Sequence, residues 1–162
     1  MDHVGRLLLR LLLVPLGGMV AVAVAIAVVV AAHWGAIQAL ATADPERQGD
    51  YMMALVAAGP ELFVALSTTM LYTLAAAAIG VLIAEVFAIR SWIFHAANGG
   101  LSAWIGWSLS ASGDGGLRAF SEPKTLIAAG LAAGLAYWLI AGSTSGFFKP
   151  LRTPRIPEPA SR

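Results

Sequence analysis

The sequence predicts an all-α, polytopic membrane protein with four transmembrane helices, an N-terminal interfacial helix and a short outer helix. Two observations support this fold class. Hydrophobic residues make up 59% of the 162 residues and charged residues only 12%, about half of the ~25% usual in soluble domains. Charged residues are also absent from four long stretches, 11–43, 62–84, 91–113 and 125–148. Because about 20 apolar helical residues cross a bilayer, each stretch can hold a span.

Composition also excludes several classes of function. The formal net charge is +1, so no strong positive field attracts an anionic polymer such as nucleic acid. The chain has no cysteine, which rules out disulfides, thiolate metal sites and cysteine nucleophiles. Too few charged residues remain to cover a soluble globule of this size. A soluble enzyme, a disordered chain and a nucleic-acid binder are therefore excluded.

The first charge-free stretch is too long for one span. A helix over residues 7–41 would measure about 50 Å, whereas the hydrocarbon core of a bilayer is about 30 Å thick. Proline and glycine at Pro15–Gly18 predict a break or bend there. The sequence therefore predicts an interfacial helix at 4–14 and a first span at about 18–38.

The same N-terminal features also fit a secretory signal. Arg6 and Arg10 precede an apolar stretch that ends near Ala41-Thr42-Ala43, a small-residue pattern typical of a cleavage site. The apolar stretch is longer than a signal core usually is, so we favour an uncleaved span. Arg6 and Arg10 are four residues apart, so they share one face of the interfacial helix.

Helix-start signals place the remaining elements. Asp44-Pro45-Glu46 offers a cap, a proline at the first helical position and an acid in the first turn, which predicts an outer helix at about 45–58. Gly59-Pro60-Glu61 ends that helix and begins the second span. The later spans are expected at about 61–84, 91–109 and 124–145.

The distribution of lysine and arginine predicts the orientation. Residues 1–148 form a single four-span membrane domain, and residues 149–162 form a proline-rich tail. Cytoplasmic loops carry an excess of basic residues, so the richer side should lie in the cytoplasm together with both termini. That side carries Arg6, Arg10, Arg90, Lys149, Arg152, Arg155 and Arg162, and the other side carries Arg47, Arg118 and Lys124.

Hydroxyl groups in the second span form a candidate polar path. Thr69, Tyr72 and Thr73 share one helix face, and Glu85 follows at the cytoplasmic end. Such hydroxyls could line a hydrated route. More often they bond to the preceding helical turn or to a neighbouring helix.

Glu85 also has a plainer interpretation. An ionisable group inside a membrane is by default a functional candidate, but residue 85 is expected at the interface. There it can form an ion pair with Arg90, Arg6 or Arg10 that holds a tight hairpin. The interfacial charges we single out are Arg6, Arg10, Arg90, Lys149 and Arg152.

Small residues predict close helix packing. Faces of glycine and alanine let helices approach closely, which replaces the missing hydrophobic drive in lipid. These faces could pack within the chain or against a partner. They comprise Gly99, Ala103 and Gly106 in the third span, Gly130 and Gly134 in the fourth, and Ala76, Gly80 and Ala84 in the second.

His33 and His95 suggest a metal or haem site, because histidine is the commonest metal ligand. They are expected in opposite leaflets, with no second ligand at suitable spacing. Motifs for phosphate loops, zinc proteases, serine hydrolases and dinucleotide sites are missing from the sequence. We therefore expect no metal, no cofactor and no enzymatic activity, although a membrane enzyme or haem protein using these histidines is a third alternative.

These features favour a non-catalytic accessory, scaffold or assembly subunit of a membrane complex. The outer segment, with Tyr51, Met52 and Met53, offers a surface for partners. The alternative is a small oligomeric transporter or channel that uses the hydroxyl path. Expected partners are the lipid bilayer and other membrane-protein subunits or further copies of the chain, but not nucleic acid. The expected location is a bacterial inner membrane.

Overall fold

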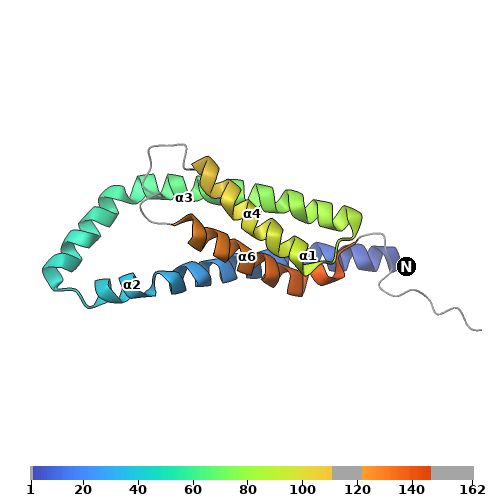
Figure 1. Ribbon diagram of the computed structural model, residues 1–162, viewed down its shortest axis with the longest axis horizontal. Helices are drawn as coiled ribbons and strands as arrows, with labels where there is room; N and C mark the ends of the chain where they lie inside the picture. Colours follow the sequence, from blue (N-terminus) through green and yellow to red (C-terminus); the bar gives the residue numbers. More distant parts are fainter. Residues whose placement is uncertain (1, 111–121, 147–162) are drawn as a thin grey trace, which may run out of the picture.

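The computed structural model describes residues 2–110 and 122–146 of the chain. All regular structure in these residues is helical. Three of the helices contain segments long and apolar enough to cross a membrane, which confirms an all-helical membrane protein: Leu8–Ala32, Pro45–Phe87 and Pro123–Ile140. The elements are α1 (Asp2–Ala32), α2 (Trp34–Ala41), α3 (Pro45–Phe87), α4 (Trp92–Ser110), α6 (Pro123–Ile140) and the 3-10 turn η1 (Gly142–Thr144) (Figure 1).

Helix α4 is not one of those three. Its 19 residues approach the length needed for a span, but His95, Asn98 and Ser102 lower its hydropathy. The three polar side chains lie on the part of α4 that packs against other helices. The lower hydropathy of α4 therefore comes from polar side chains that pack between helices, and α4 is still a regular helix.

The predicted break at Pro15–Gly18 is wrong, because α1 runs unbroken from Asp2 to Ala32. Residues 4–14 are therefore not a separate interfacial helix. Proline removes one backbone donor, but neighbouring helices make such positions tolerable in membrane helices. Gly17 instead lets α1 pack closely against the residue that follows α6, because a Cβ at Gly17 would lie 3.1 Å from the Cβ of Ala141. The first helix instead ends at Ala32, and after His33 helix α2 continues in nearly the same direction (Figure 1).

The predicted outer helix and second span are likewise one helix, α3. The helix starts as expected, with Asp44 at the N-cap and Pro45 in the first turn, and then passes through Pro60. Its 43 residues measure about 64 Å, twice the ~30 Å hydrocarbon core. Figure 1 shows α3 curving in its first half. Proline is a usual cause of such bending, because it removes a hydrogen bond from the helix.

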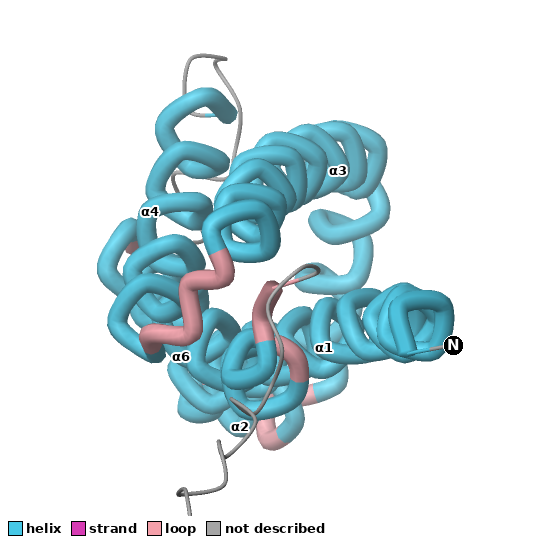
Figure 2. The backbone as a smooth tube through the Cα atoms, turned by 90° about the vertical axis from the view of Figure 1, so that its right-hand side faces the viewer, coloured by secondary structure: helices cyan, strands magenta, loops and turns pink. Residues whose placement is uncertain are grey.

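Helices α4 and α6 form the centre of the bundle. They pack against each other, α1 packs on α6, and α3 packs on α4, whereas α1 and α3 scarcely contact each other. The view along the bundle in Figure 2 shows α1 and α3 separated, with α4 and α6 to one side of both. The buried apolar residues are mostly alanines, which fits close contact between helix backbones.

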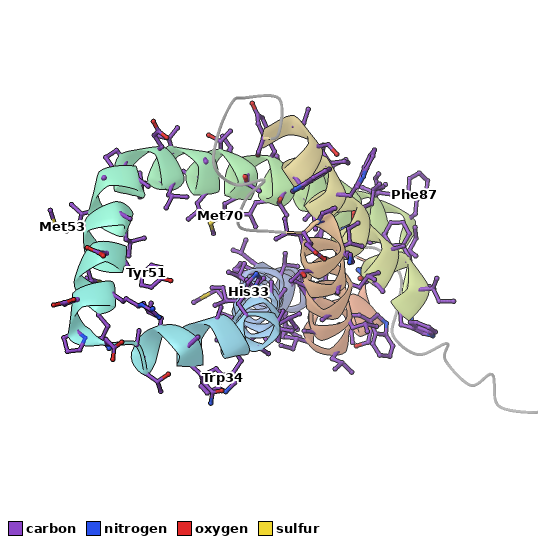
Figure 3. The ribbon with its side chains drawn as sticks, turned by 60° about the vertical axis from the view of Figure 1, so that its left-hand side comes forward. His33, Trp34, Tyr51, Met53, Met70 and Phe87 are labelled. Atoms are coloured by element: carbon purple, nitrogen blue, oxygen red, sulfur yellow. The ribbon has the colours of Figure 1, made fainter. Side chains whose placement is uncertain are left out.

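One part of the chain lies beyond this bundle. We call residues 34–60 the arm, which comprises α2 and the first part of α3. The arm extends past the ends of α4 and α6 and joins the α1 side of the molecule to the α3 side (Figures 1 and 3). Helix α2 packs only lightly on α1, so the arm has little support from the rest of the chain.

Candidate functional site

A long apolar cavity lies between α1 and α3, on a floor made by α4 and α6. We call it the groove; its volume is about 700 Å³, within the ~300–1,000 Å³ usual for ligand pockets. Because α1 and α3 do not close over it, the groove opens sideways. No charged side chain lines it in the part of the chain that the structure describes. Its walls include Ala25 and Val29 of α1, Ala78 and Leu82 of α3, Asn98 and Ser102 of α4, and Gly130 and Ala133 of α6.

A buried ion pair closes one end of the bundle, which we call the polar end. The Arg10 Nη1 atom lies 2.8 Å from Glu85 Oε1, and the two side chains are 7% and 2% exposed. The same Nη1 group donates to the Ala141 carbonyl at 3.0 Å. The backbone N–H of Gly146 donates to Glu85 Oε2, also at 3.0 Å. This pair thus ties α1, α3 and the end of α6 together.

Arg10, 75 positions away in the sequence, is therefore the partner of Glu85 among the three arginines considered from sequence. Arg90 has another role, because its Nε donates to the Ser145 carbonyl at 3.0 Å. Trp138 Nε1 donates to the Arg90 carbonyl at 2.8 Å. The side chain of Arg6 and the whole of Lys149 and Arg152 lie outside the described residues.

Two aromatic rings meet where the groove reaches the polar end. His95 and Tyr137 both line the groove, are 2% and 7% exposed, and have ring centroids 5.5 Å apart. His95 Nε2 lies 3.3 Å from the Ile89 carbonyl, so this nitrogen donates and Nδ1 carries the lone pair. Within the described chain, His95 Nδ1 and the Tyr137 hydroxyl have no hydrogen-bond partner.

Sequence reasoning did not single out Tyr137. A signal was nevertheless present, because Gly130, Gly134 and Tyr137 are spaced at i, i+4 and i+7 and share one face of α6. A tyrosine that follows a small-residue face points into the same interface as the glycines. His95 was expected near the cytoplasmic interface, and its burial depends on a contact with Gly142 that the sequence does not reveal.

The predicted polar path is only partly gathered in the structure. Thr69 and Thr73 line the groove, at the end nearer the arm. Thr69 Oγ1 lies 2.8 Å from the Ala65 carbonyl and 2.7 Å from Ser110 Oγ. Its hydroxyl therefore bonds to the preceding turn of α3 and to α4. Tyr72 is 39% exposed and does not line the groove, and Glu85 is bound to Arg10. The transporter alternative therefore stays a prediction.

The two histidines lie at different parts of the molecule. His33 occupies the turn between α1 and α2, with Nδ1 2.9 Å from the Val29 carbonyl, whereas His95 is at the polar end. Among residues 8–110 and 122–146, whose side chains the structure describes, no group of three or more potential metal ligands gathers. The structure thus does not bring the two histidines together.

The small-residue faces pack inside the chain. Gly99 of α4 lies against the backbone of Gly130 and Gly134 of α6, and a Cβ at Gly130 would lie 2.7 Å from the Cβ of Ala103. Gly106 faces α3, where a Cβ would lie 3.0 Å from the Thr69 carbonyl. These glycines therefore set the spacing of the bundle itself.

Comparison of the chain with known protein families, curated proteins and solved structures finds no match.

Proposed function

We propose that this chain is a four-span protein of a bacterial inner membrane that serves as a non-catalytic accessory or assembly subunit. In this proposal the arm docks on a larger membrane-protein partner. The observation that carries it is an apolar surface outside the bundle: Tyr51, Met53 and Val56 are 58%, 73% and 70% exposed. In Figure 3, Met53 points away from the bundle and Tyr51 points towards it, so large side chains are exposed on both sides of the arm.

The position of the arm argues against lipid as its sole environment. Glu46, Arg47 and Asp50 lie within one to two turns of the exposed apolar residues. Charged side chains in hydrocarbon are costly, and exposed apolar area in water costs about 25 cal/mol per Å². A protein surface at the membrane interface can satisfy both kinds of side chain.

Charge favours a different chain as the partner over a second copy. The arm and its immediate flank carry four acids and one base: Asp44, Glu46, Asp50 and Glu61, with Arg47. Two such arms side by side would repel, whereas a basic surface would be complementary. The lysine and arginine bias supports placing the polar end and both termini in the cytoplasm, with the arm on the opposite side.

Single cysteines test the proposal, because the natural chain has none. Met53→Cys places a thiol on the arm, and Leu139→Cys places a control thiol at a bundle position that is 69% exposed. After cross-linking in native membranes, we expect one product of fixed mass from Met53→Cys only. Combined Glu46→Lys and Asp50→Lys substitutions should abolish that product while the protein stays monodisperse.

Three outcomes would sink the docking proposal. They are a product with the mass of two copies of this chain, equal products from both cysteine positions, and a product that survives the charge reversal.

A further inference from the structure

We propose that the groove is a binding site for a long-chain lipid with a small, uncharged headgroup that carries a hydroxyl. The tail would lie along the groove, and the headgroup would bind His95 and Tyr137 at the polar end. This inference does not depend on the arm.

The unpartnered atoms at the polar end define the headgroup chemistry. The Tyr137 hydroxyl can donate a hydrogen bond, and His95 Nδ1 can accept one, yet both are buried without a partner in the described chain. Buried polar atoms normally have partners, and leaving one unpaired costs about 1–3 kcal/mol. A hydroxyl group at the groove end can accept from the Tyr137 hydroxyl and donate to His95 Nδ1, so it supplies what both atoms lack.

The surrounding backbone is shaped to hold these two rings. A Cβ at Gly17 of α1 would lie 3.2 Å from the Tyr137 ring, and a Cβ at Gly142 would lie 2.7 Å from His95 Nε2. A larger residue at Gly17 or Gly142 would therefore collide with one of the two rings. The position of the donor and acceptor is fixed by packing from two sides, as a binding site requires.

Charge on the groove walls argues for a neutral headgroup. The lining residues include no acid, lysine or arginine. Arg10 and Glu85 form an ion pair at 2.8 Å, and neither residue lines the groove, although Arg10 Nη2 has no hydrogen-bond partner in the described chain. A phosphate headgroup would enter this site without a counter-charge, and an unpaired buried charge is far more costly than an unpaired neutral group.

The length of the groove argues for one long tail that lies extended along it. The α1 wall runs from Val14 to Val30, which is about 24 Å of helix. One leaflet supplies only about half of the ~30 Å hydrocarbon core. The groove is thus longer than one leaflet's share of the core, and it opens sideways, so an extended isoprenoid chain can enter it from the membrane.

Photolabelling of the full-length protein in phosphatidylcholine vesicles tests this inference. The probes are geranylgeraniol and geranylgeranyl phosphate, each with the same diazirine in the tail. We expect the alcohol to label the groove walls around Ala25 and Ala78 several-fold more than the phosphate. Tyr137→Phe should lower labelling by the alcohol about two- to tenfold, the loss expected for one hydrogen bond. Tyr72→Phe, which removes a hydroxyl outside the groove, should leave it unchanged.

A second variant keeps the test independent of the tyrosine. Ala78 lines the groove but is exposed on its open side, so Ala78→Phe can fill the groove without repacking the bundle. It should abolish labelling while the protein stays monodisperse. Stronger labelling by the phosphate, equal labelling in Tyr137→Phe and the natural chain, or labelling that survives Ala78→Phe would each overturn the inference.

Discussion

Two pairs of helices in this bundle, α4 with α6 and α1 with α3, are held by different means. Helices α4 and α6 meet through glycines, so close that a Cβ at Gly134 would lie 3.0 Å from the Ala96 Cα. Helices α1 and α3 stay apart across the groove and are tied at one end by Arg10 and Glu85. Lipid offers no hydrophobic drive for association, so helices must gain either backbone contact or a polar bond. The comparison shows both solutions within one small protein.

Glu85→Ala should have the largest effect on stability, because it leaves the Arg10 guanidinium buried without its partner. Removing one member of a buried pair typically costs about 3–5 kcal/mol. Unfolding in a titration with denaturing detergent, followed by tryptophan fluorescence, measures the loss.

A matched control separates pairing from packing at this position. Replacing both residues with methionine leaves no uncompensated charge, so Arg10→Met with Glu85→Met should be closer to the natural chain than Glu85→Ala is. If Glu85→Ala unfolds at the same detergent fraction as the natural chain, the pair does not hold α1 to α3.

Gly134→Ala should have the next largest effect, through the glycine contact of α4 with α6. The added Cβ meets backbone and not a flexible side-chain end, so the helices must move apart. Overpacking of this kind costs about 1–3 kcal/mol. The same unfolding titration measures it.

Gly59→Ala is the control for helix propensity. A Cβ there has nothing within 4 Å, so the substitution should stabilise α3 by up to about 1 kcal/mol. Equal effects of the two alanine substitutions would mean that α4 and α6 are not in the close contact described.

The sequence was sufficient for the all-helical class and for the start of α3. The lack of charges predicts membrane helices, and Asp44-Pro45 predicts the start of α3, because both signals are local. The breaks predicted at Pro15 and at Gly59-Pro60 failed for a shared reason. A proline disfavours a helix in isolation, but packing and the need to satisfy backbone groups in lipid can override it.

The candidate site was less accessible from sequence. Glu85 was recognised as one half of an ion pair, but choosing Arg10 over two other arginines needs the relative depth and rotation of α1 and α3. The role of Tyr137 depends on Gly17 from a different helix. Such contacts between distant segments arise from packing, which leaves no periodic pattern in the chain.

Glu122→Gln should have the smallest effect, and it isolates burial as the cause of the difference. Lys124 Nζ lies 2.8 Å from Glu122 Oε2, the same distance as in the Arg10–Glu85 pair, but the two side chains are 82% and 68% exposed. The hydrogen bond and charge of Lys124 hold the pKa of the Glu122 carboxyl below its ordinary value of 4.5. The contribution of this pair is therefore present above pH 4.5 and is lost as the pH falls through the lower folded value. Solvent screens such a pair, so the unfolding midpoint of Glu122→Gln should be only slightly below that of the natural chain at pH 7 and should match it at low pH. A shift at pH 7 as large as that of Glu85→Ala would mean that the N–O distance, and not burial, sets the strength of an ion pair in this protein.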